Sequence, residues 1–290
     1  MTIEHARAHA LPKPWGVAEQ CPWNGTSHNG PAIGEIWYER STPDARAPRL
    51  LLKLLFTSEP LSIQVHPDDV YARSMGFANG KTEAWYVLSA QTDAKVALGL
   101  TRRFTSRQLR QAVDDGSISD LVVWQPVHAG DSIFVPAGTI HAIGAGLVIA
   151  EIQQRGDATF RLFDHGRGRE LHINDAIAVA NARPADFGGP PTRLSAERAL
   201  LTSNSHFTFE RIDLASNSIW RLEAERETWL LVISGSGRAG PFGMDVGDAI
   251  FLQSDRINIH SGKTGLVALL ACTGGDVPKL LRCADADTVQ

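Results

Sequence analysis

The sequence has few cysteines and no long apolar segment. Its three cysteines, Cys21, Cys272 and Cys283, form no CxxC pair among the 290 residues. An odd number of widely spaced cysteines argues against a disulfide framework and against a cysteine zinc site, so we expect a reducing compartment, the cytoplasm. No apolar run approaches the roughly 18 to 20 residues of a membrane helix, and the N-terminal stretch MTIEHARAHALPKPW has two prolines and no apolar core typical of an export signal.

An excess of one charge is also missing. The chain has 28 Lys and Arg against 32 Asp and Glu, which gives a net charge of −4 and a pI near 6.2. The two signs are interspersed, so no basic stripe is present that would attract nucleic acid or an anionic membrane. With 43% hydrophobic and 21% charged residues, the composition excludes collagen, a coiled coil and a disordered tail protein. We expect no nucleic-acid or membrane partner.

Short β-type runs separated by Gly, Pro, Asn and Asp fill most of the chain. Such runs are typical of an all-β sandwich or barrel. The clearest ones are Ile33 to Tyr38, Leu50 to Phe56, Ala84 to Leu88, Ser132 to Val135 and Leu147 to Gln153.

Two stretches have helical spacing instead. From Thr105 to Leu121, Ser106 can serve as a cap for apolar residues near a 3.6-residue period, which predicts one or two short helices. A second helical stretch is expected at roughly Asn174 to Asn181.

Two motifs occur twice in the chain. Glu83-Ala-Trp85-Tyr-Val-Leu is echoed by Glu227-Thr-Trp229-Leu-Leu-Val, and Gly130-Asp-Ser-Ile-Phe-Val is echoed by Gly247-Asp-Ala-Ile-Phe-Leu. The repetition predicts two similar β modules. The motifs lie 47 residues apart in the first copy (83 to 130) and 20 apart in the second (227 to 247), so the first module carries an insertion, the helical stretch near 101–121. A Pro- and Gly-rich segment predicts the boundary between Pro184 and Ser195, which gives modules at 1–188 and 189–290.

A strand, a turn and a strand present one histidine in the first module. The spacing Gly130-(x5)-Pro136-x-Gly138-x-x-His141 resembles the second motif of the cupin superfamily, in which this turn aims a histidine into the mouth of a small β-barrel. The resemblance implies two jelly-roll (double-stranded β-helix) modules. A single histidine could also be a surface or hydrogen-bonded residue, and the turn sequence favours the ligand.

Three further candidate ligands lie upstream of that histidine. Gln64 and His66 have the period of a strand and face the same way, and Glu83 begins the next strong strand. Two imidazoles, a carboxylate and a neutral amide suit a borderline divalent ion and leave room for substrate oxygens. Gln64 taken alone could equally be a strand residue that bonds its neighbour.

Several longer motifs resemble type I mannose-6-phosphate isomerase, and the short chain resembles its compact bacterial branch. They cover about residues 13 to 167, which is over half of the chain. The motifs are Lys13-Pro-Trp15-Gly, Ile33-Gly-Glu35-Ile-Trp37, Lys53-Leu-Leu, Leu61-Ser62-Ile-Gln64-Val-His66-Pro-Asp, Gly80-Lys81-Thr-Glu83-Ala-Trp85-Tyr, His141-Ala-Ile-Gly-Ala-Gly, Glu151-Ile-Gln-Gln and Asp157-Ala-Thr-Phe-Arg161-Leu-Phe-Asp164.

This resemblance implies a zinc-dependent aldose-ketose isomerase of carbohydrate metabolism, which interconverts mannose 6-phosphate and fructose 6-phosphate through a cis-enediol intermediate. It implies one zinc per chain on Gln64, His66, Glu83 and His141, with Arg161 in the active site. One departure concerns the loop before the glutamate ligand. The enteric and fungal enzymes have His-Lys-Pro-Glu there and this chain has Gly80-Lys81-Thr82-Glu83, so a role of that histidine in proton transfer does not carry over.

The residue types also suit the reaction when taken by themselves. Moving a carbonyl between C1 and C2 requires a base for a weakly acidic C–H proton, and a metal stabilises the enediolate that forms. The candidates for proton transfer are Glu151, Asp157 and Lys81. Arg161 can hold an oxyanion or a phosphate with two nitrogens, and it could instead simply pair with Asp157 or Asp164. Substrate-binding roles are expected for Lys53, Ser62, Trp15 and Arg167.

Three other functions stay open on the sequence alone. They are a non-catalytic sugar-binding or regulatory cupin, an isomerase that acts on a different or unphosphorylated sugar, and a metal oxygenase. An oxygenase usually needs a redox metal with open positions for oxygen, and the Gln ligand and basic cluster fit a sugar phosphate better. The sequence leaves the metal and the choice between monomer and homodimer undecided. Trp85 could stack on a sugar or fill the core, and its echo Trp229, in the module without ligands, favours the core.

The second module lacks the residues that define the site in the first. When the Gly247 motif is aligned on the Gly130 motif, Gln253 replaces Pro136, Asp255 replaces Gly138 and Asn258 replaces His141. We therefore expect a degenerate module without a metal, and His260 as an ordinary histidine.

Overall fold

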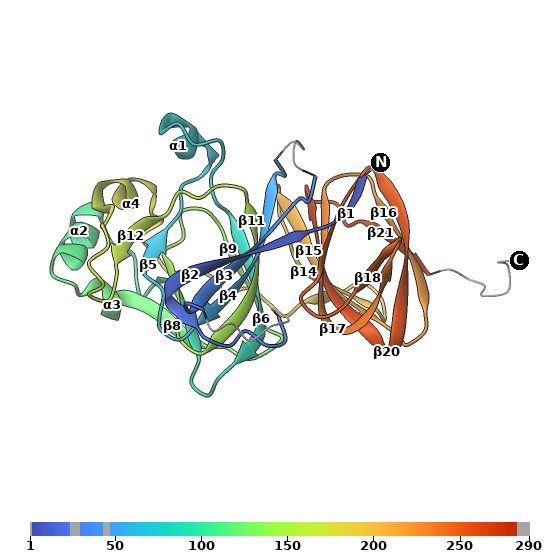
Figure 1. The fold of residues 1–290 in the computed structure, drawn as a ribbon. Helices are drawn as coiled ribbons and strands as arrows, with labels where there is room; N and C mark the ends of the chain where they lie inside the picture. Colours follow the sequence, from blue (N-terminus) through green and yellow to red (C-terminus); the bar gives the residue numbers. More distant parts are fainter. Residues whose placement is uncertain (1, 24–29, 43–46, 283–290) are drawn as a thin grey trace, which may run out of the picture.

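The computed structural model describes residues 2–23, 30–42 and 47–282, and it has two β lobes side by side (Figure 1). The predicted all-β fold is confirmed, since the described chain forms antiparallel sheets with short helices confined to one lobe. Cys283 lies outside the described residues. Among the described residues, no helix has the length and apolar character needed to cross a membrane.

Two sheets build the lobe on the left of Figure 1. The six-stranded sheet has the order β2 (Arg7–Val17), β3 (Ile33–Glu39), β4 (Leu50–Thr57), β11 (Leu147–Gln154), β6 (Glu83–Ala90), β9 (Ser132–Val135). The five-stranded sheet has the order β12 (Phe160–Phe163), β5 (Ile63–Val65), β10 (His141–Ile143), β7 (Lys95–Leu100), β8 (Val122–Pro126). The five β runs expected from the sequence here are all strands.

Four short helices belong to this lobe, three at its outer end and one at its top (Figure 1). They are α1 (Asp69–Ser74), α2 (Ser106–Asp114), α3 (Ile118–Leu121) and α4 (Ile173–Val179). The predicted helices are confirmed, but the cap of α2 is Thr105 and not Ser106. Oγ1 of Thr105 accepts the backbone N–H of Gln108 at 3.3 Å, and the Gln108 side chain accepts the backbone N–H of Thr105 at 2.9 Å. Helix α1 was not predicted, because its six residues have no apolar period to reveal it.

A single ten-stranded sheet forms the other lobe. Its main path is β1 (Thr2–His5), β19 (Ala249–Gln253), β17 (Thr228–Ala239), β20 (Asp255–Thr273), β15 (Phe207–Leu214), β14 (Arg198–Ser203), β13 (Thr192–Arg193), and β16 (Ile219–Ala224), β18 (Phe242–Met244) and β21 (Lys279–Arg282) pair alongside it. Strand β1 pairs with β19 from Thr2↔Gln253 to His5↔Ile250. The sequence predicts that residues 1–188 form the first module. Strand β1, at the N-terminus, instead completes the sheet of the second lobe. We propose that the two modules divide near residue 188, with β1 assigned to the second module.

Strand β4 is buried on both faces, and its alternation explains how the lobes join. Leu50, Leu52 and Leu54 belong to an apolar core that the second lobe completes with Phe209 and Trp229. Neighbouring positions point the other way, into the first lobe, because side chains alternate along a strand. The second lobe therefore covers the outer face of the sheet that carries the candidate site.

A buried carboxylate fastens the two lobes together at the start of β4. Glu227, the echo of Glu83, is 5% exposed and accepts the backbone N–H groups of Arg49 at 2.6 Å and Leu50 at 2.8 Å. It also accepts the indole N–H of Trp229 at 3.2 Å. This carboxylate of the second lobe therefore binds two backbone N–H groups at the start of a strand of the first lobe.

We expect Glu227→Ala to lower the free energy of unfolding by about 3 kcal/mol, because it leaves buried N–H donors without an acceptor. Urea unfolding followed by circular dichroism measures the change. The exposed neighbour Glu225 serves as the matched control, and Glu225→Ala should stay within about 0.5 kcal/mol of the parent. Equal stability of the two variants would show that Glu227 does not hold the lobes together.

Candidate functional site

Three buried side chains converge where the two sheets of the first lobe face each other. Nε2 of His141 lies 3.3 Å from Oε1 of Glu83, and Nε2 of His66 lies 3.6 Å from Oε2 of the same carboxylate. Each side chain is 1% exposed, and their ligand atoms all lie within 4.8 Å of one another. Gln64 joins the group, with its amide nitrogen 3.3 Å from Nε2 of His141.

The histidines are oriented by the backbone. Nδ1 of His66 lies 2.9 Å from the carbonyl of Ala158, and Nδ1 of His141 lies 2.8 Å from the carbonyl of Thr139. A carbonyl only accepts, so each Nδ1 carries the proton and each Nε2 presents a lone pair to the cluster. Burial lowers the pKa of His141 to about 4 and the pKa of His66 well below its usual value, which keeps both rings neutral.

A divalent cation fits this arrangement. Nε2 of His66 is buried and has no hydrogen-bond partner among the described residues, although a buried polar atom normally has one. Two imidazole nitrogens and a carboxylate around one point are ligands for a divalent transition metal. Among the described residues, this is the one group of three or more such side chains close enough to hold an ion.

Local structure explains how the sequence brings the ligands together. Strand β5 lies between β12 and β10, so that Gln64 pairs with Arg161 on one side and with His141 on the other. The turn before His141 needs Gly138, whose φ is +84° and whose N–H donates to the carbonyl of His66 at 2.8 Å. The turn that resembles the cupin motif thus aligns both histidines.

Charged side chains continue from the cluster along the inner face of the six-stranded sheet. The Lys81 ammonium lies 2.9 Å from Glu83 Oε2 and 3.8 Å from Glu151 Oε1, and the Lys53 ammonium lies 3.5 Å from the same Glu151 oxygen. All four groups are at most 6% exposed. Lys53 and Glu151 are direct neighbours on β4 and β11, so the sheet register sets their contact.

The two lysines respond differently to burial. Burial lowers the pKa of the Lys53 ammonium, which Glu151 only partly offsets. For Lys81, burial also favours the neutral form, but Glu83 and Glu151 together outweigh it and hold the pKa above its ordinary value. The two carboxylates therefore favour the charged form of Lys81 beside the cluster.

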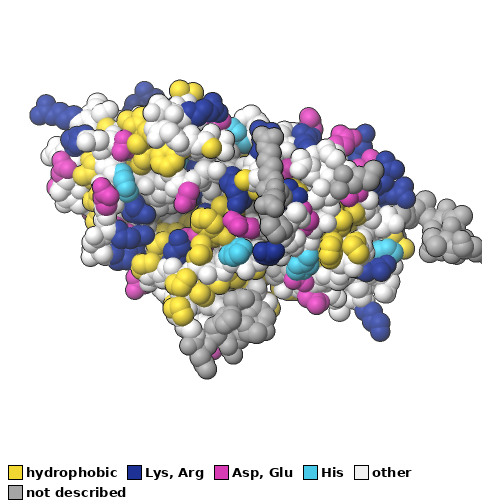
Figure 2. All heavy atoms as spheres, turned by 45° about the horizontal axis from the view of Figure 1, so that its top comes forward, with side chains coloured by type: hydrophobic (Ala, Val, Ile, Leu, Met, Phe, Trp, Pro, Cys, Tyr) yellow, Lys and Arg dark blue, Asp and Glu magenta, His cyan; other side chains and the backbone are white. Residues whose placement is uncertain are grey.

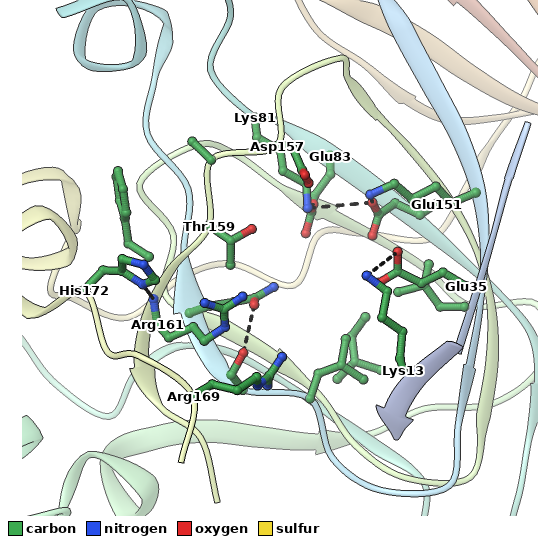
Figure 3. A pocket seen from close by; sticks show the side chains of 18 of the residues that line it. Lys13, Glu35, Lys81, Glu83, Glu151, Asp157, Thr159, Arg161, Arg169 and His172 are labelled. Carbon is green, nitrogen blue, oxygen red and sulfur yellow. Dashed lines mark hydrogen bonds and ion pairs between the residues drawn. The ribbon is translucent and has the colours of Figure 1, made fainter. Parts of the chain in front are cut away.

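A cavity of about 470 Å³ opens onto these groups (Figure 3). The sequence-predicted residues that line it come from both sheets and from the loops between them. They are Arg161, Lys81, Glu151, Asp157, Lys53, Ser62, Trp15, Gln64 and Glu83. Trp85 does not line it and is a fully buried core residue against the ring of His141, at 5.6 Å between ring centroids. Trp85 therefore belongs to the core, which resolves that alternative.

Arg161 reaches into the cavity without a carboxylate partner. Among the described residues, no Asp or Glu lies within ion-pair distance of its guanidinium, although Asp157 and Asp164 are close in sequence. Asp164 instead binds Arg167 and Arg169. The alternative in which Arg161 is one half of a structural ion pair is not what the structure has.

Arg167, predicted to bind substrate, lies outside the cavity wall. Its guanidinium donates to the carbonyl of Pro60 at 2.8 Å and to Asp164 at 3.0 Å, and it does not line the cavity. Arg169, two residues on, does line it and sits over the Trp15 ring at 5.0 Å. In a loop, no helix or strand period fixes the direction of a side chain, so the sequence could not indicate which of the two arginines faces the cavity.

Several residues of the cavity wall were not predicted from the sequence. Lys13 pairs with Glu35 at 3.3 Å, and Glu35 accepts the Trp37 indole N–H at 2.6 Å. All three residues lie within the motifs found in the sequence. The alternation of side chains along their strands is the signal that could have placed them on the inner face of the six-stranded sheet. His172, at the start of α4, lines the cavity too and had no sequence signal.

Comparisons with known proteins identify relatives over most of the chain. No protein-family model matches. A Bacillus subtilis protein named "Probable mannose-6-phosphate isomerase GmuF" is 31% identical over 244 residues, which cover 77% of this chain and 76% of that protein. The chain belongs to the mannose-6-phosphate isomerase family. The resemblance drawn from the motifs is thereby confirmed.

Further matches agree with this membership. The mannose-6-phosphate isomerase of Streptococcus mutans is 38% identical over 201 residues, which is 65% of this chain and only 62% of that one. The solved mannose 6-phosphate isomerase of Bacillus subtilis has the same fold, with a TM-score of 0.82, 24% identity and coverage of 93% of this chain and 99% of that one. A structure of mannose 6-phosphate isomerase bound with zinc and yttrium also matches, with a TM-score of 0.72, 13% identity and coverage of 94% and 100%.

The second lobe of this mannose-6-phosphate isomerase family member has no counterpart of the cluster among its described residues. Asn258 stands on β20 where the alignment expected the histidine, and His260 pairs with Ile219 and Arg238 across the sheet. The absence of a metal from this lobe stays a prediction.

We expect His66→Ala and His141→Ala each to lose bound divalent metal, because a site with few ligands tolerates no such loss. Elemental analysis of the purified protein should give about one ion per chain for the parent. His260→Ala is the matched control and should keep the full amount. Full metal content in both first-lobe variants, or its loss in His260→Ala, would show that the ligands are wrongly assigned.

Proposed function

We propose that this protein is a metal-dependent aldose-ketose isomerase that interconverts mannose 6-phosphate and fructose 6-phosphate. The observation that carries the proposal is a buried cluster of two neutral imidazoles and a carboxylate, whose Glu83 lines a cavity, with a Lys53–Glu151–Lys81 row beside it. Such a site offers ligands for a cation, a carboxylate for proton transfer and fixed positive charge, which the reaction needs together.

Zinc is the proposed metal, held by His66, Glu83, His141 and Gln64. The Ser62 hydroxyl donates to Oε1 of Gln64 at 3.0 Å, which turns the Gln64 amide nitrogen toward Nε2 of His141, so the amide must rotate to offer its oxygen to the ion. When bound, such an ion supplies a Lewis acid that polarises the carbonyl and hydroxyl oxygens of the sugar.

Glu151 is the carboxylate we assign to the C–H proton. It is 3% exposed, lines the cavity, and has an ammonium on either side of one oxygen. Removal of a proton from C2 leaves negative charge on the enediol oxygens, and Lys81 holds a full positive charge next to that position. Asp157 lies at the exposed rim and is assigned to the proton that passes between the oxygens.

Arg161 is assigned to the phosphate. The other cavity cations already face carboxylates, since Lys13 pairs with Glu35 and the two buried lysines pair with Glu151. A dianion therefore gains most from the guanidinium that has no such partner and can offer two parallel N–H groups.

The decisive experiment is a coupled assay with mannose 6-phosphate beside free mannose and ribose 5-phosphate. We expect turnover of mannose 6-phosphate by the metal-loaded protein, with kcat/KM at least about a hundredfold above that for free mannose, because the phosphate supplies charge-assisted contacts. Preference for free mannose would favour an isomerase of unphosphorylated sugars. Binding without turnover would favour the sugar-binding cupin.

We expect Arg161→Lys to lower kcat/KM for mannose 6-phosphate by about a hundredfold or more, on the order of 3 kcal/mol, because the lysine keeps the charge but loses the planar fork. Metal content should be unchanged. Activity within about threefold of the parent would reduce Arg161 to a structural residue.

A further inference from the structure

The wall of the cavity around Arg161 contains an imidazole that the reaction as described does not use. His172 lies next to Arg161 in Figure 3 and lines the same cavity. Two hydrogen bonds join the residues: the backbone N–H of His172 donates to the Arg161 carbonyl at 2.9 Å, and the backbone N–H of Arg161 donates to Nδ1 of His172 at 3.3 Å.

The second of these bonds fixes the tautomer of the ring. A backbone N–H can only donate, so Nδ1 must present its lone pair, and the neutral ring carries its proton on Nε2. No partner for Nε2 is found among the described residues, although the ring is half-buried in the cavity wall. His172 thus presents a free N–H donor, held in place by the residue that carries the guanidinium.

This donor lies in the outer wall of the cavity, beside Arg161. Strand β12, which carries Arg161, is next to β5 with its ligand Gln64, and the site runs from the metal ligands on β5 and β10 outward to β12 and α4. The phosphoryl group of a hexose 6-phosphate is at the opposite end of the carbon chain from C1 and C2. With those carbons at the metal ligands, the phosphoryl oxygens extend toward this outer wall.

We propose that His172 is a specificity-determining residue that donates Nε2–H to a phosphoryl oxygen of the substrate beside Arg161. The inference rests on the proposed function, since it assumes that the substrate of this site is a sugar phosphate. Arg161 supplies charge and two parallel donors, and His172 supplies a third donor from a second direction, so that a phosphate is told apart from a flat carboxylate.

Two substitutions separate the two ring nitrogens. His172→Asn keeps an acceptor near the position of Nδ1 for the Arg161 N–H and removes the Nε2 donor. His172→Gln places an amide N–H near the position of Nε2 and gives up the acceptor. The control is His128→Asn, because the His128 side chain is 83% exposed and does not line the cavity.

The measurements are KM and kcat for mannose 6-phosphate, the inhibition constant of inorganic phosphate, and metal content. We expect His172→Asn to raise KM and the inhibition constant about tenfold or more, with a smaller effect on kcat, since a hydrogen bond to a charged group is lost. His172→Gln should stay within about threefold of the parent, and His128→Asn should match it. Unchanged constants in His172→Asn, or equal damage in His172→Gln, would overturn the proposal.

A second measurement covers the case in which His172→Asn does not fold or loses its metal. In the zinc-loaded parent, inorganic phosphate should shift the ring N–H resonance that disappears in His172→Gln, and an unmoved resonance would overturn the proposal. Failure of the function gives a different result. A parent that does not isomerise mannose 6-phosphate refutes the isomerase, whereas an active parent with an unaffected His172→Asn refutes only the role of His172.

Discussion

Strand β4 alternates its side chains between two interiors, and the candidate site depends on that alternation. Leu50, Leu52 and Leu54 pack into the core shared with the second lobe, while Lys53 and Leu55 face the cavity. The strand tolerates a buried lysine because its opposite face buries apolar side chains against the second lobe, and that burial stabilises the strand. The same parity on β11 sends Ala150 and Ile152 outward and Glu151 inward.

Buried charge then dictates the chemistry of the cavity floor. Isolated ions are costly to bury, so Lys53, Lys81, Glu83 and Glu151 are stable here only as a connected set. The set leaves the Nε2 lone pair of His66 without a donor, which a cation would satisfy. On the face of the molecule shown in Figure 2, Lys and Arg side chains are interspersed with Asp and Glu.

The two lobes use equivalent glutamates for different purposes. Glu83 at the start of β6 points into the metal cluster, whereas Glu227, beside the start of β17, binds the backbone of β4 and the indole of Trp229. Both glutamates are buried two residues before a tryptophan. They differ in the groups that compensate the charge of the carboxylate. A duplicated module can in this way keep its fold after losing its site, and take part in holding the other site together.

Local patterns in the sequence were enough to predict the β architecture and the repeat, because strand period and turn glycines are local properties of the chain. They also indicated His66, Glu83 and His141 as candidate ligands and favoured a core position for Trp85 through its echo, Trp229. The tertiary structure was needed to pair β1 with the distant β19, to place Asp164 against Arg167 and not Arg161, and to bring His172 beside Arg161. A local pattern indicates which way a side chain faces but not which of several competing groups it contacts, and these outcomes depend on that competition.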